Sequence, residues 1–138
     1  MNYPNHQSIL HRPKDLKSIA KKVLVELKLH SIKTIAVCGV SGTVLGGAVS
    51  ALSSRIKLVI VRKEGEKNHY GRAAQGPWEI EEYNFPDYAF VDDLIATGNT
   101  LQRVIDSLGK KPSLIILYVD RGTRVMIDEI KVKRIGIE

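Results

Sequence analysis

The chain of 138 residues has one cysteine, and aromatic side chains make up only 6% of it. A single cysteine excludes an intramolecular disulfide, and the place of Cys38 in the apolar run Ile35–Cys38 favours a buried, unreactive thiol. No apolar run approaches the roughly 20 residues that a membrane-spanning helix needs. The first residues show no continuous apolar stretch and no small-residue cleavage site, so we expect no secretory signal peptide. These absences predict a cytoplasmic protein without a membrane partner.

Length and composition predict a single domain over residues 1–138. The hydrophobic and charged fractions, 43% and 26%, are ordinary for a globular protein, and the chain is long enough to bury a core. The formal net charge of +6 favours a polyanionic partner but leaves its class open. Several lysines fall on the polar side of the first predicted helix, where solvation explains them, so charge alone does not decide the function.

Helical and strand periodicities alternate along the chain, which predicts an α/β domain with a mainly parallel sheet. Apolar residues at helical spacing predict three helices, and Gly109 is placed to end the last of them. These helices cover residues 14–29, 44–52 and 101–108. Short apolar runs predict the central strands 34–38, 57–61, 88–92 and 114–119.

Three further segments have their own patterns. Residues 63–76 are polar and contain three glycines, which predicts a long loop of the kind that closes over a site. Residues 78–81 alternate between apolar and acidic and predict a half-exposed strand. Residues 130–137 alternate between apolar and basic and predict an edge strand.

The segment that follows the strand 88–92 carries the most chemical information. Asp92 and Asp93 place two adjacent carboxylates at the strand end, and Thr-Gly-Asn-Thr at 97–100 opens the next helix. Open α/β sheets bind ligands at the carboxyl ends of their strands, and a helix N-terminus rich in N–H and hydroxyl groups suits a phosphate. The alternative is that Asp93 and the threonines only cap the helix and close a turn. Since the string exceeds what capping needs, we predict a ribose 5-phosphate site.

Residues 91–100 resemble the phosphoribosyl-pyrophosphate (PRPP) signature of the type I phosphoribosyltransferases, and the order of parts is similar over roughly residues 33–122. The resemblance implies the type I phosphoribosyltransferase (Rossmann-like) fold, an α/β fold with a mainly parallel central sheet, flanking helices and a small hood. It implies that Asp92 and Asp93 contact the ribose hydroxyls and lie near Mg²⁺, because two carboxylates and diphosphate oxygens suit a hard cation. The implied 5-phosphate loop consists of Ala96, Thr97, Gly98, Asn99 and Thr100.

A second segment fits the pyrophosphate-binding loop of the same family. It consists of Gly39, Val40, Ser41 and Gly42, which follow a strand and open a helix. Small residues let the backbone approach an anion closely, although an ordinary glycine turn is the alternative. The string has no Gly-Lys-Ser/Thr ending, which excludes a Walker A loop, and its second glycine comes one residue too early for a nucleophile elbow.

A third segment resembles the Arg-Lys strand end and following loop of orotate and adenine transferases. Arg62 and Lys63 end the strand, and Lys67 and His69 lie on the loop. The resemblance implies that the three basic side chains neutralise the pyrophosphate and that His69 moves with the loop. A solvated basic loop is the alternative.

The implied reaction is displacement of pyrophosphate from PRPP by a ring nitrogen of a base, in nucleotide salvage or biosynthesis. Catalysis would rest on positioning and charge stabilisation, with Asp92, Asp93, Arg62 and Lys63 as its residues. In this family a hood selects the base, and its candidates here are residues 1–13 and 120–138. Asp120 and Arg121 are the candidate base-pocket residues.

The base is left open, because two resemblances conflict. Residues 120–122 resemble the Asp-Arg-Gly segment of the uracil transferases that attenuate pyrimidine operons and bind RNA, whereas Asp92–Leu101 is closer to the adenine enzymes. The Asp-Arg-Gly segment and the net positive charge favour a second hypothesis, a non-catalytic sensor of PRPP or a nucleotide that binds nucleic acid. The acidic pair, the Arg-Lys pair and the loop 63–76 favour the enzyme. We expect a homodimer, the family's usual state.

Overall fold

The computed structural model describes residues 12–62, 86–93, 98–119 and 126–136. Within these residues, six strands form one sheet in the order β2-β1-β3-β4-β6-β5. Every neighbouring pair is parallel except β5 and β6. This confirms the mainly parallel α/β architecture predicted from the sequence. The strands are β1 (Thr34–Cys38), β2 (Lys57–Val61), β3 (Ala89–Asp92), β4 (Leu114–Leu117), β5 (Met126–Ile127) and β6 (Ile130–Arg134).

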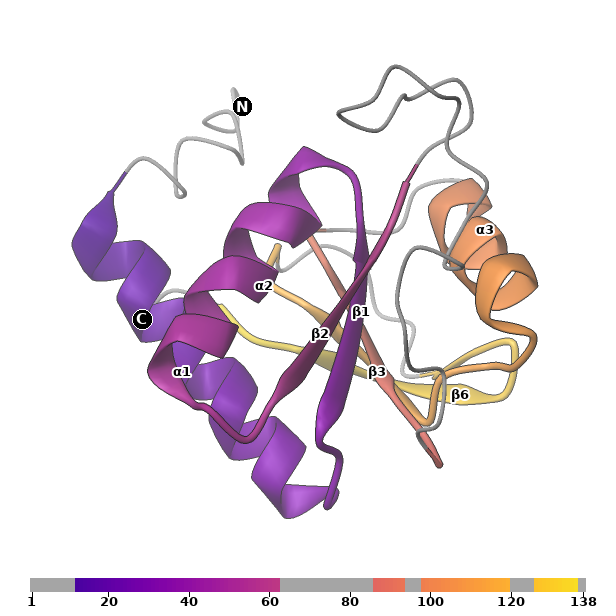
Figure 1. Ribbon diagram of the computed structural model, residues 1–138, viewed down its shortest axis with the longest axis horizontal. Helices are drawn as coiled ribbons and strands as arrows, with labels where there is room; N and C mark the ends of the chain where they lie inside the picture. The colour runs from indigo at the N-terminus through magenta and orange to yellow at the C-terminus, as the bar shows by residue number, and fades with distance from the viewer. Residues whose placement is uncertain (1–11, 63–85, 94–97, 120–125, 137–138) are drawn as a thin grey trace.

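In the described segments, three helices cover the two faces of the sheet: α1 (Pro13–Leu29), α2 (Val40–Leu52) and α3 (Asn99–Leu108). Figure 1 shows α1 and α2 on one side of the strands and α3 on the other. Successive strand residues point to opposite faces, so β3 sends Val91 into the core under α1 and α2 and Phe90 into the core under α3. Buried on both faces, the central strands are continuous apolar runs, which is why the sequence predicted them well.

Two predicted helix ends can be compared with the structure. Gly109 ends α3 in the left-handed conformation with φ +74°, as predicted. Helix α2 begins at Val40, so the segment at residues 39–42 opens the helix as predicted, ahead of the apolar periodicity that starts at residue 44. Its first turn, Val40–Thr43, consists of small residues without apolar periodicity, so the periodic pattern starts only at the second turn.

The carboxyl-terminal segment differs from the prediction of an edge strand over residues 130–137. Strand β6 lies inside the sheet, parallel to β4 on one side and paired with β5 on the other, and β4 is therefore not the last central strand. Ile130 and Val132 are buried while Lys131 and Lys133 are exposed, so the alternation reports one solvated face and not a sheet edge. Strand β5 has two residues, too few to give a pattern in the sequence.

Other predictions concern the thiol and the membrane. Cys38 is a free cysteine and is buried at the end of β1, as predicted. In the part of the chain that the structure describes, no helix is long and apolar enough to cross a membrane. The predicted loop 63–76 and the predicted strand 78–81 lie outside the described residues.

The sheet order contains a reversal between β1 and β3. From β1 the chain passes through α2 to β2, which pairs with one edge of β1, whereas β3 pairs with the other edge. The connections that leave β1 and β3 therefore run to opposite sides. In open α/β sheets such a reversal opens a crevice at the carboxyl ends of the two strands, and ligands bind there. The topology alone thus places a candidate site at the ends of β1 and β3.

Helix α2 approaches the sheet closely at its first turn. A Cβ atom on Gly42 would lie 3.0 Å from the carbonyl oxygen of Val91 and 3.3 Å from the Cβ of Val37. A side chain at position 42 would therefore push α2 away from the end of β3. Gly47, on the exposed side of the same helix, has no heavy atom within 4 Å of such a Cβ.

We expect Gly42→Ala and Gly47→Ala to have opposite effects on stability. Both gain the helix propensity of alanine, up to about 1 kcal/mol. Only Gly42→Ala must displace a backbone carbonyl, and overpacking of this kind costs about 1–3 kcal/mol. Urea denaturation followed by circular dichroism should rank Gly47→Ala above the wild type and Gly42→Ala below it. Equal free energies of unfolding in the two variants would contradict the close approach.

Candidate functional site

The loop between β1 and α2 presents free backbone donors to the crevice. Gly39 has φ +88° and ψ 173°, a conformation that is essentially restricted to glycine. The backbone N–H and the hydroxyl of Thr43 both donate to the carbonyl oxygen of Gly39, at 3.1 Å and 2.6 Å, and close the first turn of α2. The N–H groups of Val40, Ser41 and Gly42 have no acceptor within the helix, and they lie at its positive end. This loop is therefore suited to an anion.

The two carboxylates of the acidic pair lie beside this loop. Asp92 ends β3 and is 7% exposed, and Asp93 follows it half-buried. The backbone N–H of Asp93 donates to Oδ1 of Asp92 at 2.8 Å, which orients the first carboxylate. A Cβ on Gly42 would lie 3.7 Å from the same Oδ1. The crevice thus joins an anion-binding loop to two negative side chains.

The acidic pair fits Mg²⁺ only together with a ligand. Mg²⁺ is usually held by one or two carboxylates and by substrate phosphates, and Asp92 and Asp93 offer such hard oxygen donors. Among the residues described, no group of three or more His, Cys, Asp or Glu side chains could hold a metal ion by itself. The donor set therefore suits a cation that a diphosphate ligand helps to bind.

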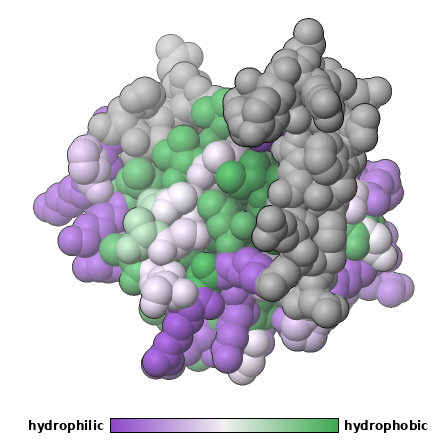
Figure 2. All heavy atoms as spheres, in the orientation of Figure 1, coloured by the Kyte–Doolittle hydropathy of each residue, from purple (hydrophilic) through white to green (hydrophobic). Residues whose placement is uncertain are grey.

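Arg62 lies level with the anion-binding loop. It follows Val61, the partner of Cys38 in the pairing of β2 with β1, so it stands beside Gly39 across the two strands. A hollow of about 300 Å³ extends between Arg62 and the loop that follows β1. Figure 2 shows hydrophobic surface over the face formed by α2 and β2, where Val40 is 68% and Ile60 41% exposed. The hollow is lined by Gly39, Val40, Thr43, Val44, Ile60, Val61 and Arg62.

The start of α3 is the described part of the predicted 5-phosphate loop. Gly98 precedes the helix with φ +86°, and its carbonyl oxygen accepts from the N–H of Gln102 at 2.9 Å. Asn99 and Thr100 form the first turn, with Thr100 half-buried. The first N–H groups of α3 again have no acceptor within the helix, which suits a second anionic group.

Tyr118 is a residue at this edge that the sequence analysis did not single out. It follows β4, its N–H donates to the carbonyl oxygen of Asp92 at 3.3 Å, and it is 2% exposed. Its hydroxyl is buried and has no hydrogen-bond partner among the described residues. Burial, opposed by the nearby Ser41 side chain and reinforced by the charges of Asp93 and Asp92, raises the pKa of Tyr118 to about 12.

The relation between Ser41 and Tyr118 needs one distinction. The Ser41 side chain is near enough to lower the tyrosine pKa, but the two hydroxyls do not meet the geometry of a hydrogen bond. The sequence signal for Tyr118 was a polar tip at the carboxyl end of an apolar strand, at the same sheet edge as Asp92.

The structure brings part of the predicted site together. Gly39–Gly42, Arg62 and Asp92–Asp93 meet at the carboxyl ends of β1, β2 and β3, and Gly98–Thr100 begin α3. The remaining predicted site residues lie outside the described residues. They are Lys63, Lys67, His69, Ala96, Thr97, Asp120 and Arg121.

Comparison with solved structures identifies the fold. The chain resembles the adenine phosphoribosyltransferase of Thermoanaerobacter pseudethanolicus with a TM-score of 0.67 and 18% identity, over 99% of this chain and 88% of that one. It resembles the orotate phosphoribosyltransferase of Aeropyrum pernix with a TM-score of 0.63 and 19% identity, over 97% and 77%. It also resembles the APRTase of Giardia lamblia complexed with 9-deazaadenine, with a TM-score of 0.55 and 22% identity, over 81% and 70%.

These likenesses define the class: the chain has the type I phosphoribosyltransferase fold, as its PRPP-like signature predicted. No protein-family model and no curated protein sequence matches the chain. At identities of this size, the similarity establishes the fold, and the activity has to be argued from the site.

The raised pKa of Tyr118 predicts a loss of stability in alkali. An unfolded tyrosine ionises near pH 10, so between about pH 10 and 12 the unfolded chain loses a proton that the folded chain keeps. The stabilisation is complete below pH 10 and is lost as the pH rises through this window. By about pH 11.5 the loss should reach about 1–2 kcal/mol.

Urea denaturation at a series of pH values measures this effect. Tyr118→Phe should flatten the decline of the unfolding free energy above pH 10, while the contribution of Tyr88, whose pKa burial also raises, remains in both proteins. Parallel declines in the wild type and the variant would show that the Tyr118 hydroxyl is not buried.

Proposed function

We propose that this protein is a phosphoribosyltransferase that transfers the 5-phosphoribosyl group of PRPP to a nitrogenous base and releases pyrophosphate. The observation that carries the proposal is the meeting of Asp92 and Asp93 with the loop Gly39–Gly42 at the β1–β3 crevice. Neighbours of the same fold are adenine and orotate phosphoribosyltransferases, which supports the class of reaction and leaves the acceptor base open.

Each part of PRPP has a group in the site that can bind it. The free N–H groups of residues 40–42 and the guanidinium of Arg62 face the pyrophosphate. The Asp92 and Asp93 carboxylates accept hydrogen bonds from the ribose hydroxyls, and the start of α3 holds the 5-phosphate. Mg²⁺, when bound with the diphosphate, would neutralise charge on the leaving group.

In this reaction the protein has to position the reactants and stabilise the charges that develop. The bond between the anomeric carbon and a pyrophosphate oxygen breaks with its electron pair on the oxygen, and a ring nitrogen of the base supplies the pair for the new bond. A proton carried by that nitrogen passes to water or to the released pyrophosphate. Positive charge develops on the sugar near Asp92 and Asp93, and negative charge develops beside Arg62 and the loop after β1. Preorganised groups of both signs stabilise this separation.

The first experiment is a pyrophosphate-release assay with PRPP, Mg²⁺ and a panel of adenine, hypoxanthine, guanine, xanthine, uracil and orotate. We expect one base to stimulate release, which would name the acceptor together with the activity. If no base does so while calorimetry detects PRPP binding, transfer to these bases is rejected and a sensor is favoured.

The double variant Asp92→Asn with Asp93→Asn tests the site assignment. We expect PRPP affinity to fall about tenfold or more, because hydrogen bonds to charged groups contribute about 1.5–3 kcal/mol. The melting temperature should stay near that of the wild type, since an amide oxygen at position 92 can still accept from the Asp93 N–H. Asp106→Asn, on the exposed side of α3, is the matched control and should change neither quantity. Unchanged PRPP affinity in the double variant would refute the assignment.

A homodimer in the cytoplasm remains part of the proposal. Val40, Val44 and Ile60 are exposed apolar side chains on α2 and on β2, an edge strand of the described sheet, and they support a contact with another subunit. The single buried cysteine supports a reducing compartment.

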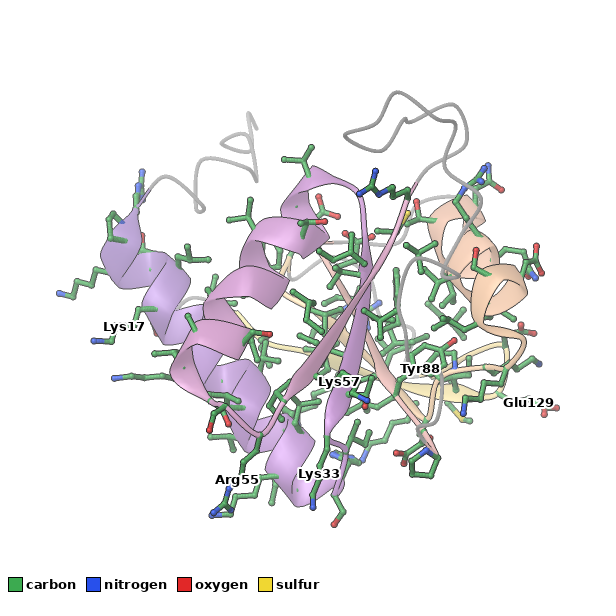
Figure 3. The ribbon with its side chains drawn as sticks, viewed as in Figure 1. Lys17, Lys33, Arg55, Lys57, Tyr88 and Glu129 are labelled. Carbon is green, nitrogen blue, oxygen red and sulfur yellow. The ribbon has the colours of Figure 1, made fainter. Side chains whose placement is uncertain are left out.

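A second candidate is a regulator that binds nucleic acid, and the amino end of the sheet favours it. Lys33, Arg55 and Lys57 precede or begin β1 and β2 at this end, where Figure 3 labels them, and the N–H of Lys57 donates to the Lys33 carbonyl oxygen at 2.8 Å. This end is opposite the crevice, so RNA and PRPP would not compete for it.

We expect RNA binding to be weak, independent of sequence and steeply reduced by salt, as charge alone would make it. A fluorescence titration with several RNAs between about 50 and 200 mM salt measures this. Tight binding of one RNA at the upper salt concentration would favour the regulator over the enzyme.

A further inference from the structure

Among the described residues, Tyr88 just before β3 and Tyr118 just after β4 are buried tyrosines, and they differ in one respect. The hydroxyl of Tyr88 donates to the carbonyl oxygen of Lys110 at 2.6 Å. The hydroxyl of Tyr118 has no partner among the described residues, although the side chain is 2% exposed. Leaving a buried hydroxyl unpaired lowers stability, so a phenylalanine would serve the core better. Packing of the core therefore does not explain why residue 118 is a tyrosine and not a phenylalanine.

The place of Tyr118 suggests that reason. Its ring belongs to the apolar cluster under α1 and α2, together with Val37 and Val91, and its hydroxyl end lies by the Ser41 side chain in the first turn of α2. Ser41 is itself 7% exposed. The hydroxyl thus stands behind the anion-binding loop, on the side away from solvent. The other described hydroxyl that is buried without a partner, that of Ser50, lies near the far end of α2.

We propose that Tyr118 is a positioning residue for Ser41: when an anion binds the loop, the Tyr118 hydroxyl donates to Ser41 Oγ, and Ser41 donates its own proton to an anion oxygen. The inference rests on the proposed function only in taking the pyrophosphate of PRPP as the anion. A serine hydroxyl has one proton and two lone pairs, so it can accept from the tyrosine and donate to the ligand at once. Each bond of such a chain polarises and strengthens the next.

The donor and acceptor roles in these two hydrogen bonds follow from the groups at either end, the phenol of Tyr118 and the anion. The phenol can accept as well as donate, but a Ser41 hydroxyl that donates to an anion keeps only its lone pairs for the tyrosine, so the tyrosine is the donor. The anion can only accept. Ser41 is left with one orientation that satisfies both neighbours, and this orientation aims its proton into the crevice beside the N–H groups of Val40 and Gly42. The tyrosine thereby fixes a hydroxyl that would otherwise rotate.

Calorimetric titration of the full chain with pyrophosphate and Mg²⁺ tests the proposed hydrogen bonds from Tyr118 to Ser41 and from Ser41 to the anion. Tyr118→Phe removes one oxygen and should weaken pyrophosphate binding about tenfold, as expected for one lost hydrogen bond to a charged system. Its melting temperature should equal or exceed that of the wild type, because the unpaired hydroxyl is gone. The matched control is Tyr88→Phe, which should bind pyrophosphate as the wild type does but melt at a lower temperature, because the Lys110 carbonyl loses its donor.

A double-mutant cycle with Ser41→Ala separates positioning from a general structural role. If Tyr118 acts through Ser41, the combined variant should bind pyrophosphate about as weakly as Ser41→Ala alone. Additive losses, or full affinity in Tyr118→Phe while the wild type binds pyrophosphate, would overturn the inference and leave the proposed function intact. A wild-type protein that binds neither pyrophosphate nor PRPP would refute the proposed function, and the inference with it.

Discussion

The approach of α2 to the end of β3 determines the geometry of the site. A Cβ on Gly42 would lie 3.0 Å from the Val91 carbonyl oxygen, so a side chain at position 42 would have to shift the helix or this carbonyl by a few tenths of an ångström. This closeness brings the free N–H groups of one segment beside the Asp92 carboxylate of another. Because β1 pairs in parallel with β3, the loop after β1 and the acidic pair after β3 lie at the same edge of the sheet. The absence of a side chain at Gly42 lets the two come close to each other.

The site that results holds charges of both signs within a small volume. The start of α2 and the guanidinium of Arg62 attract anions, while Asp92 and Asp93 repel them. An isolated phosphate would gain from one half of the site and lose to the other. A ligand with phosphates at its ends and hydroxyls between them, accompanied by a divalent cation, satisfies both halves. The arrangement therefore favours a sugar diphosphate over a simple anion.

Much of the fold could be predicted because its strands are buried on both faces. Residues 34–38 and 57–61 match β1 and β2 as predicted, and β3 and β4 differ from their predictions by two residues or fewer. The loop after β1 and the acidic pair could be recognised because each is a local string with its own chemistry. Features of this kind depend on neighbours in sequence, so one sequence is sufficient to find them.

What escaped prediction depends on neighbours in space. Strand β6 was expected at an edge because its alternating pattern reports solvent on one face, while its place in the sheet is set by pairing with β4 and the short β5. The first turn of α2 shows no apolar periodicity, because Val40 is exposed and Gly42 lies against the Val91 carbonyl oxygen of β3. Tyr118 ends an ordinary apolar strand, and its importance follows only from the register that places its N–H against Asp92.

The departures from ordinary packing at the crevice weigh against the reading that these residues only cap helices. Capping needs an oxygen at the helix start and a turn before it. It needs neither a backbone conformation restricted to glycine at position 39, nor a buried carboxylate at Asp92, nor a buried hydroxyl without a partner at Tyr118. Each of these lowers stability or restricts the sequence, and all three lie at the carboxyl ends of β1, β3 and β4. Such conflicts between local preference and global fold concentrate where a structure serves a ligand.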